Sequence, residues 1–143
     1  MTQHARSVLT LKLLPIVLVA AAAAMTPSSG EAATFGDGIH AVGGGIAPAT
    51  YRTRVAPTSF CYWARLSGFG GTLDEILSNS FSDITQVVTI SPSDVGFESD
   101  GCGTWTTDLS AITGSPTAAF SNGTFIVGVD VSVGTWLAPG GSS

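Results

Sequence analysis

Residues 60–66 read FCYWARL, and this short run is the best guide to the fold. Its aromatic and aliphatic side chains suit a pleated, half-buried surface. Runs of the same kind recur along the chain at close intervals, with turn residues between them, which predicts an all-β protein. The predicted strands are residues 39–42, 50–54, 60–66, 84–90, 95–98, 104–107, 124–127 and 134–137.

One helical signal interrupts this pattern, in residues 72–77. Thr72 and Glu75 have the spacing of a capping box, and apolar residues follow at helical intervals. A short helix or a single turn is therefore expected there. Taken together, the sequence predicts a small antiparallel β-sandwich or open barrel with at most one short helix and one disulfide.

The first 32 residues have the organisation of a secretory signal peptide. Arg6 and Lys12 lead into an apolar run, and small residues follow up to Ala32, after which we place the cleavage site. The apolar run is shorter than the roughly 20 residues of a membrane-spanning helix, and Pro15 interrupts it. An uncleaved membrane anchor is the alternative. We expect a secreted or envelope-associated protein with no membrane span after processing.

The charge of the remaining chain argues against two classes of partner. Removal of residues 1–32 leaves three arginines, no lysine and nine acidic residues, so the net charge becomes 3 − 9 = −6. Such a chain repels nucleic-acid phosphates and anionic lipid surfaces. Its acidic residues do not have the spacing of a calcium loop, and we assign no metal site and no cofactor.

The two cysteines, Cys61 and Cys102, are predicted to form a disulfide. In an exported chain an isolated pair of cysteines is usually oxidised. Closing a loop of about 40 residues stabilises a small domain by about 4 kcal/mol on the chain-entropy estimate.

An internal repeat divides the mature chain. Residues 35–51 read FGDGIHAVGGGIAPATY and residues 120–136 read FSNGTFIVGVDVSVGTW. At a constant offset of 120 − 35 = 85 positions they share an aromatic residue, a turn glycine, a Val-Gly pair, an aliphatic residue, a threonine and a final aromatic residue. We therefore expect a complete β-module in residues 33–110 and a partial second copy in residues 120–137.

The repeat also sets the other predicted boundaries. Residues 111–119 are expected to be a linker, and the glycine-rich residues 138–143 a disordered tail. A two-stranded fragment buries too little surface to stand alone. The partial copy must therefore pack on the first module, pair with another chain in self-association, or stay frayed.

Several short motifs resemble those of a known family. They are Val42-Gly43, Thr50-Tyr51-Arg52, Cys61-Tyr62-Trp63-Ala64-Arg65, Phe97-Glu98 and Gly101-Cys102-Gly103-Thr104-Trp105. Over about residues 35–107 the chain resembles small exported actinobacterial β-domains, lipoprotein-like or freely secreted, whose modules read V-G-x-D-I-x-P-G-T-Y, C-Y-W-x-R and G-C-G-T-W. The resemblance implies an extracytoplasmic β-domain with its two cysteines joined, and it implies no activity. The chain departs from the pattern at Gly45, where the family has Asp, and at Ala49, where it has Gly.

The candidate binding surface consists of Tyr51, Tyr62, Trp63, Arg65 and Trp105. The rings either pack around the disulfide in the core or form a platform for a sugar ring or a peptide. Strand alternation places Tyr62 on the face opposite Cys61 and Trp63, so at least one ring is expected to face outward. Arg65 either pairs with Glu98 or Asp100 or binds an anion.

No catalytic residue is assigned. Paired carboxylates such as those among Asp94, Glu98, Asp100 and Asp108 can hydrolyse glycosides, but nothing in the sequence specifies their separation. With both cysteines bridged and lysine absent, a serine enzyme would depend on His40 alone. The sequence therefore favours a non-enzymatic module that binds an envelope glycan or a protein, or serves structurally. A small Asp/Glu-dependent hydrolase and a secreted inhibitor or effector are the alternatives.

Overall fold

The structure, a computed structural model, describes residues 31–138, so all but two residues of the predicted signal peptide and all but one residue of the predicted tail lie outside the described residues. Within this range no helix is long and apolar enough to cross a membrane. The elements are β1 (Thr34–Phe35), β2 (Gly38–Ala41), β3 (Thr50–Thr53), β4 (Cys61–Leu66), η1 (Leu73–Glu75), β5 (Ile76–Ser82), β6 (Val87–Thr89), β7 (Gly96–Asp100) and β8 (Trp105–Thr106).

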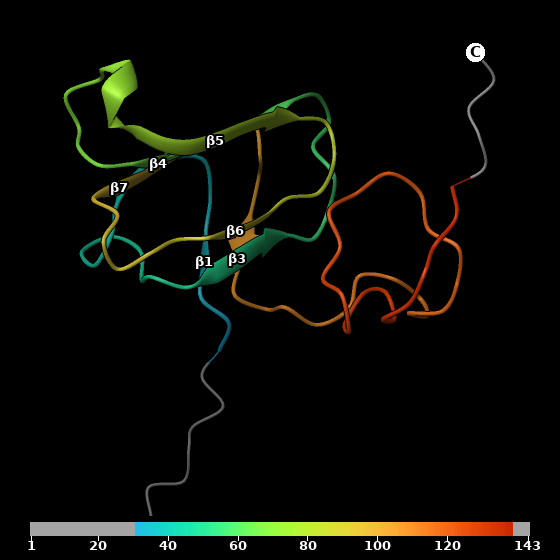
Figure 1. Ribbon diagram of the computed structural model, residues 1–143. Coiled ribbons are helices and arrows are strands. Elements are labelled where there is room, and N and C mark those ends of the chain that lie inside the picture. Colours follow the sequence, from blue (N-terminus) through green and yellow to red (C-terminus); the bar gives the residue numbers. More distant parts are fainter. Residues whose placement is uncertain (1–30, 139–143) are drawn as a thin grey trace, which may run out of the picture. The chain divides into compact units, whose positions relative to one another are not determined.

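These strands form two antiparallel sheets that lie as two layers (Figure 1). One sheet has the order β1-β8-β3-β6 and the other the order β2-β7-β4-β5, and neither closes into a barrel. The predicted all-β antiparallel sandwich is thus confirmed.

The core lies between the inner faces of the two sheets. Tyr51, Val88 and Trp105 come from the first sheet, and Cys61, Trp63 and Phe97 from the second, and all are buried. The rings of Phe97 and Trp105 meet edge to face at 5.4 Å, which joins the layers with a favourable aromatic geometry.

The predicted disulfide between Cys61 and Cys102 is confirmed. Cys61 begins β4, and Cys102 lies in the loop that leaves β7 and enters β8. Because β4 and β8 belong to different sheets, the bridge fastens one layer to the chain segment that enters the other.

One predicted strand of the sandwich differs from the structure. Residues 84–90 contain only the short strand β6, because the chain bends at Ile84 and the backbone N–H of Gln86 donates to the Thr53 side chain (2.9 Å). The capping box at Thr72 and Glu75 is present and starts a single 3-10 turn, as the sequence predicted. The chain then continues directly into β5, a seven-residue strand that was not predicted.

Residues 111–138, called the C-terminal lobe below, contain no strand (orange to red in Figure 1). The strands predicted at 124–127 and 134–137 are therefore wrong as extended elements, because no neighbouring strand pairs with them among the described residues. The buried contact between the lobe and the sandwich is made by Asp130, whose carboxylate accepts two hydrogen bonds from Arg52 of β3 at 3.1 and 3.0 Å. Arg54 also donates to the Ala111 carbonyl (3.3 Å), and the Thr124 N–H donates to the Thr85 side chain (3.4 Å).

Candidate functional site

Three of the five predicted surface residues lie in the core instead. Tyr51, Trp63 and Trp105 are at most 8% exposed, and their polar atoms have protein partners. The Tyr51 hydroxyl donates to the carbonyl of Ala47 at 2.9 Å, and burial raises the pKa of this hydroxyl. The indole nitrogens of Trp63 and Trp105 donate to the side chains of Gln86 (3.0 Å) and Ser99 (2.9 Å). These three rings therefore have a packing role.

Tyr62 and Arg65 reach the surface. Tyr62 is half-buried on the face opposite Cys61, as alternation along β4 predicts. Arg65 donates from Nε and Nη2 to both carboxylate oxygens of Asp94, at 2.7 and 2.9 Å. The hydrogen bond from Arg65 outweighs burial and lowers the pKa of Asp94.

Glu98 and Asp100 were the wrong partners for Arg65, because β7 turns both of them to the other face. In the register of β7 with β4, Phe97 lies opposite Arg65, whereas Glu98 lies opposite Ala64 and Asp100 opposite Tyr62. Side chains on neighbouring positions of a strand point to opposite faces. Glu98 and Asp100 are therefore on the outer face with Tyr62.

The three arginines of the described residues each pair with one aspartate. Arg54 contacts Asp108 at 3.2 Å on the surface, whereas Arg52 and Asp130 form a fully buried pair. Burial raises the pKa of Asp130, but hydrogen bonds from Arg52 and from backbone N–H groups lower it below its usual value overall. These charges therefore serve the structure.

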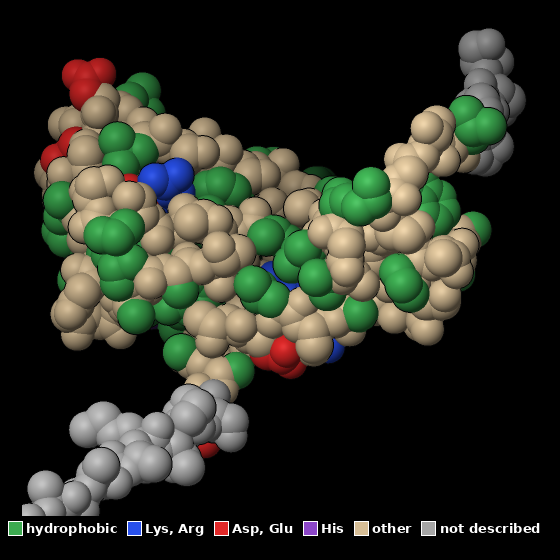
Figure 2. Space-filling model, turned by 60° about the horizontal axis from the view of Figure 1, so that its bottom comes forward, with side chains coloured by type: hydrophobic (Ala, Val, Ile, Leu, Met, Phe, Trp, Pro, Cys, Tyr) green, Lys and Arg blue, Asp and Glu red, His purple; other side chains and the backbone are tan. Residues whose placement is uncertain are grey.

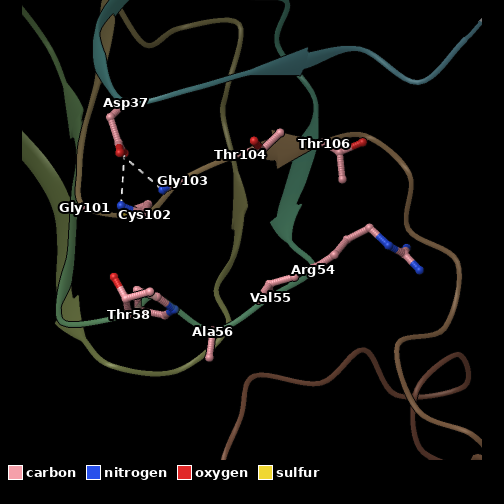
Figure 3. A pocket seen from close by; sticks show the side chains of 11 residues that line it. Asp37, Arg54, Val55, Ala56, Thr58, Gly101, Cys102, Gly103, Thr104 and Thr106 are labelled. Carbon is pink, nitrogen blue, oxygen red and sulfur yellow. Dashed lines mark hydrogen bonds between the residues drawn. The ribbon is translucent and has the colours of Figure 1, made fainter.

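A hollow of about 520 Å³ lies beside the disulfide, between the loop after β3 and the segment 101–106 (Figure 3). Its two charged residues are already engaged by the protein. The Asp37 carboxylate accepts hydrogen bonds from the backbone N–H groups of Cys102 (3.0 Å) and Gly103 (3.2 Å). Arg54 extends away from Asp37 and donates to the Ser110 carbonyl at 3.1 Å. Both charged groups of this hollow thus already have hydrogen-bond partners within the protein.

The outer face of the β2-β7-β4-β5 sheet is different, because its edge strand turns apolar side chains outward. In β5, three serines lie opposite residues on the core side of β4: Ser78 opposite Arg65, Ser80 opposite Trp63 and Ser82 opposite Cys61. Leu77 and Phe81 therefore point away from the core. Leu77 is 51% exposed and Phe81 67%. This arrangement is the reverse of the usual alternation, in which polar residues face water.

Together with other apolar side chains, Leu77 and Phe81 form a surface that we call the apolar outer face. Each of them is more than half exposed; they are Ile39, Phe60, Phe69, Leu73, Leu77 and Phe81. Phe60 and Phe81 stack on each other with their ring centroids 4.8 Å apart. At the other end, Phe69 and Leu73 border a hollow of about 490 Å³ that also contacts Glu98. Large exposed apolar patches commonly mark interaction sites.

The loop between β4 and β5 is held in place beside this hollow by Glu75. Its carboxylate accepts hydrogen bonds from the backbone N–H groups of Gly70 (3.0 Å) and Thr72 (3.3 Å). The bond from Gly70 is the largest cause of the lowered pKa of Glu75. One wall of the hollow is thus a loop that hydrogen bonds between its own residues hold in place.

No group of three or more His, Cys, Asp or Glu side chains is placed to hold a metal ion within residues 31–138. The acidic residues that the sequence grouped together are dispersed. Asp94 and Asp108 pair with different arginines, while Glu98 and Asp100 lie on the apolar outer face.

The sandwich and its bridge define a small disulfide-bridged β-domain of the exported class. Residues 32–106 match the family described as the Rv1352-like extracellular domain. This range is just over half of the chain and ends within β8, so both sheets are included. The chain belongs to this family, and it is an extracellular domain. No curated protein and no solved structure matches it.

Proposed function

We propose that this extracellular domain is a non-enzymatic binding module whose partner is an extended, largely apolar segment of another protein. The segment adds to the free edge of β5 and lays its side chains on the apolar outer face. Residues 1–32 direct the export that brings the domain to this partner. The observation that carries the proposal is the reversed alternation of β5, with serines inward and Leu77 and Phe81 outward.

The edge of β5 lacks two of the usual protections against pairing, charge and proline. Natural edge strands are commonly blunted by charge, proline or a very short length. The seven residues of β5 contain neither a charged residue nor proline. Its outer backbone groups can therefore pair with an incoming strand, as in other domains that bind peptides by strand addition.

The chemistry of the face favours a peptide over a sugar. Phe60 and Phe81 cover each other, and neither ring has a polar atom that could bond to a hydroxyl. The tryptophans and Tyr51, which would suit a sugar, are largely occupied in the core, apart from Trp136 in the C-terminal lobe. Glu98 and Asp100 lie on the same face, so a lysine or arginine in the partner segment adds electrostatic complementarity.

A displayed library of random peptides tests the proposal on the full chain. We expect enriched peptides with apolar residues at alternate positions and at least one basic residue. Their affinity should fall about tenfold or more in Phe81→Lys and Leu77→Lys, because central apolar contacts dominate such interfaces. Val133→Lys, which places a lysine at an exposed apolar position of the C-terminal lobe, is the control.

Strand addition has a second readout. N-methylation of every second residue of a binding peptide removes alternate backbone N–H groups. Only one of the two alternating sets of N–H groups faces β5, so methylation of that set should abolish binding. Peptides that bind Phe81→Lys as well as the original chain would overturn the proposal. So would an envelope glycan that binds the apolar outer face in place of a peptide.

A further inference from the structure

The C-terminal lobe repeats the aromatic contacts of the sandwich. Phe35 and His40 lie 4.8 Å apart with an interplanar angle of 57°, and Phe120 and Phe125 have the same distance and angle. Each phenylalanine also meets a later ring edge to face, at 4.9 Å in the sandwich and 5.0 Å in the lobe. The later rings are Tyr51 and Trp136, which again differ by 85 positions.

The glycine corner between these rings is repeated too. Gly43 and Gly128 have φ angles of 84° and 87°, the region that favours glycine, and each donates to a carbonyl three residues ahead at 2.7 Å. After the corner, the Tyr51 hydroxyl and the Trp136 indole each donate to a backbone carbonyl four residues earlier, at 2.9 and 3.1 Å. The two segments therefore share a local conformation as well as a sequence pattern.

The copies differ in what covers them. In the sandwich, Phe97 of β7 and Trp105 of β8 pack against Phe35, and Tyr51 is 1% exposed. Trp136, the counterpart of Tyr51, is 39% exposed. The described residues provide no second pair of strands like β7 and β8 for the lobe. Hydrophobic side chains accordingly show at the surface over the right-hand part of the molecule, where the lobe lies (Figure 2).

The backbone of the lobe shows the same difference. β2 pairs with β7 over four residue pairs, and β3 pairs with both β8 and β6. Their counterparts, residues 123–126 and 135–138, belong to no sheet. Among the described residues the lobe thus has no strand partners like β7 and β8, and the Thr124 N–H donates instead to the Thr85 side chain at 3.4 Å.

We propose that residues 120–137 are part of a second module and bind a pair of strands of the β7–β8 kind that the described residues do not supply. The sandwich itself specifies this occupant: a phenylalanine and, eight positions later, a tryptophan, on strands that add to residues 123–126 and 135–138. The inference uses the lobe alone and is independent of the apolar outer face of β5.

The lobe is prepared for such an occupant by its attachment to the sandwich. The Asp130 carboxylate binds Arg52 and also accepts from the backbone N–H groups of Ile126 (2.7 Å) and Ile112 (2.9 Å). In the first copy the equivalent position is Gly45. The aspartate therefore fixes the corner of the lobe and its place on β3 at the same time, which reduces the ordering needed on binding.

A peptide taken from the chain itself is the test probe. Residues 94–107 carrying Cys102→Ser and an N-terminal fluorophore are titrated with the full chain, and fluorescence anisotropy is measured. A short peptide that must order on binding is expected to bind in about the micromolar to millimolar range. The control peptide carries Phe97→Ser and Trp105→Ser in addition, and we expect it not to bind.

Variants of the lobe identify the site. Trp136→Ala should weaken binding about tenfold or more, whereas Trp136→Tyr, which restores the ring found in the first copy, should retain it. Phe81→Lys, on β5 and outside the lobe, should leave the affinity unchanged.

Three results would overturn the inference. They are the absence of saturable binding up to the solubility limit of the peptide, equal binding by Trp136→Ala, and loss of binding in Phe81→Lys. Sedimentation velocity adds a fourth: a dimer of the full chain that Trp136→Ala dissociates would assign the lobe to a second copy. Peptide binding that depends on Trp136 and not on Phe81 supports the proposed site in the lobe, whether or not the peptide-library experiment supports the site on β5.

Discussion

Replacing Asp130 with asparagine should release the C-terminal lobe from the sandwich. The change keeps the shape of the side chain but removes its charge and puts an amide N–H₂ where one oxygen accepted from Arg52. Arg52 and Asp130 are both fully buried, and Arg52 Nε already has no hydrogen-bond partner. The guanidinium then keeps one hydrogen bond to the asparagine oxygen and one from Nη1 to the Ser110 carbonyl at 3.2 Å, and it loses its paired counter-charge.

The magnitude follows from the burial of this pair. Breaking a buried ion pair by removing one partner costs about 3–5 kcal/mol, because the other charge is left without compensation. That cost corresponds to about two to four orders of magnitude in an equilibrium constant. The lobe can avoid it by detaching, which exposes Arg52 to water. The measured loss of stability therefore equals the smaller of two free energies. One is the cost of leaving Arg52 buried without its partner, and the other is the free energy with which the lobe docks on the sandwich.

Limited proteolysis of residues 111–138 measures this opening directly. When opening and closing are fast relative to cleavage, the cleavage rate follows the population of the open form. We expect faster cleavage in Asp130→Asn while the disulfide-bridged sandwich stays intact. Asp108→Asn is the matched control, because its pair with Arg54 is exposed and such pairs contribute at most about 1 kcal/mol. Equal cleavage rates for the original chain and Asp130→Asn would refute the reasoning.

The same ion pair predicts a pH dependence with a definite sign. The pKa of Asp130 is lowered in the folded protein. A lowered pKa stabilises the fold above the unfolded value of about 3.9, and this stabilisation is lost as the pH falls through the folded-state pKa. Cleavage of the lobe by pepsin should therefore accelerate below about pH 4 in the original chain. Asp130→Asn should lack this step, and a step of equal size in both proteins would contradict the assignment.

Two further predictions concern the sandwich. Cys102→Ala opens the bridge across 41 positions and should lower the free energy of unfolding by about 4 kcal/mol in a urea titration without reductant; a loss below about 1 kcal/mol would contradict the prediction. Gly101→Ala should destabilise more than Gly103→Ala in the same assay. Both glycines have positive φ angles, which cost an alanine about 1–2 kcal/mol, but only at Gly101 would the added carbon also collide with the Phe60 carbonyl oxygen. Equal losses would be evidence against that collision.

The sequence located most strands of the sandwich and its bridge, because these features depend on local patterns. β4 has a nearly continuous run of aromatic and aliphatic residues. β7 and β8 each contain an aromatic residue, and Cys102 lies in the short segment between them. β5 was missed because its inward positions are the serines Ser78, Ser80 and Ser82, so it lacks the apolar inner face by which strands are recognised. Its outward apolar residues, Leu77 and Phe81, alternate with the serines as in a strand. The apolar residues at helical spacing just before them obscured this pattern.

The candidate site was harder to predict than the fold, because it depends on which face each residue occupies. The predicted surface combined residues near the cysteines in sequence, yet Tyr51, Trp63 and Trp105 point inward and only Tyr62 and Arg65 reach the surface. The partner of Arg65 is Asp94, from the turn before β7. Strand alternation alone would have excluded Glu98, but the position of a turn residue requires the three-dimensional register.

The C-terminal lobe shows that a strand is a property of a pair of segments. Residues 50–53 and 135–138 occupy equivalent positions in the repeat, and the first segment is β3 while the second belongs to no sheet. The rings and the glycine corner beside them have the same geometry in both copies, so local sequence preferences are satisfied equally. What β3 has in addition is β6 on one side and β8 on the other. Cross-strand contacts supply most of the stability of a sheet, so a segment with the right sequence stays irregular until a partner strand pairs with it.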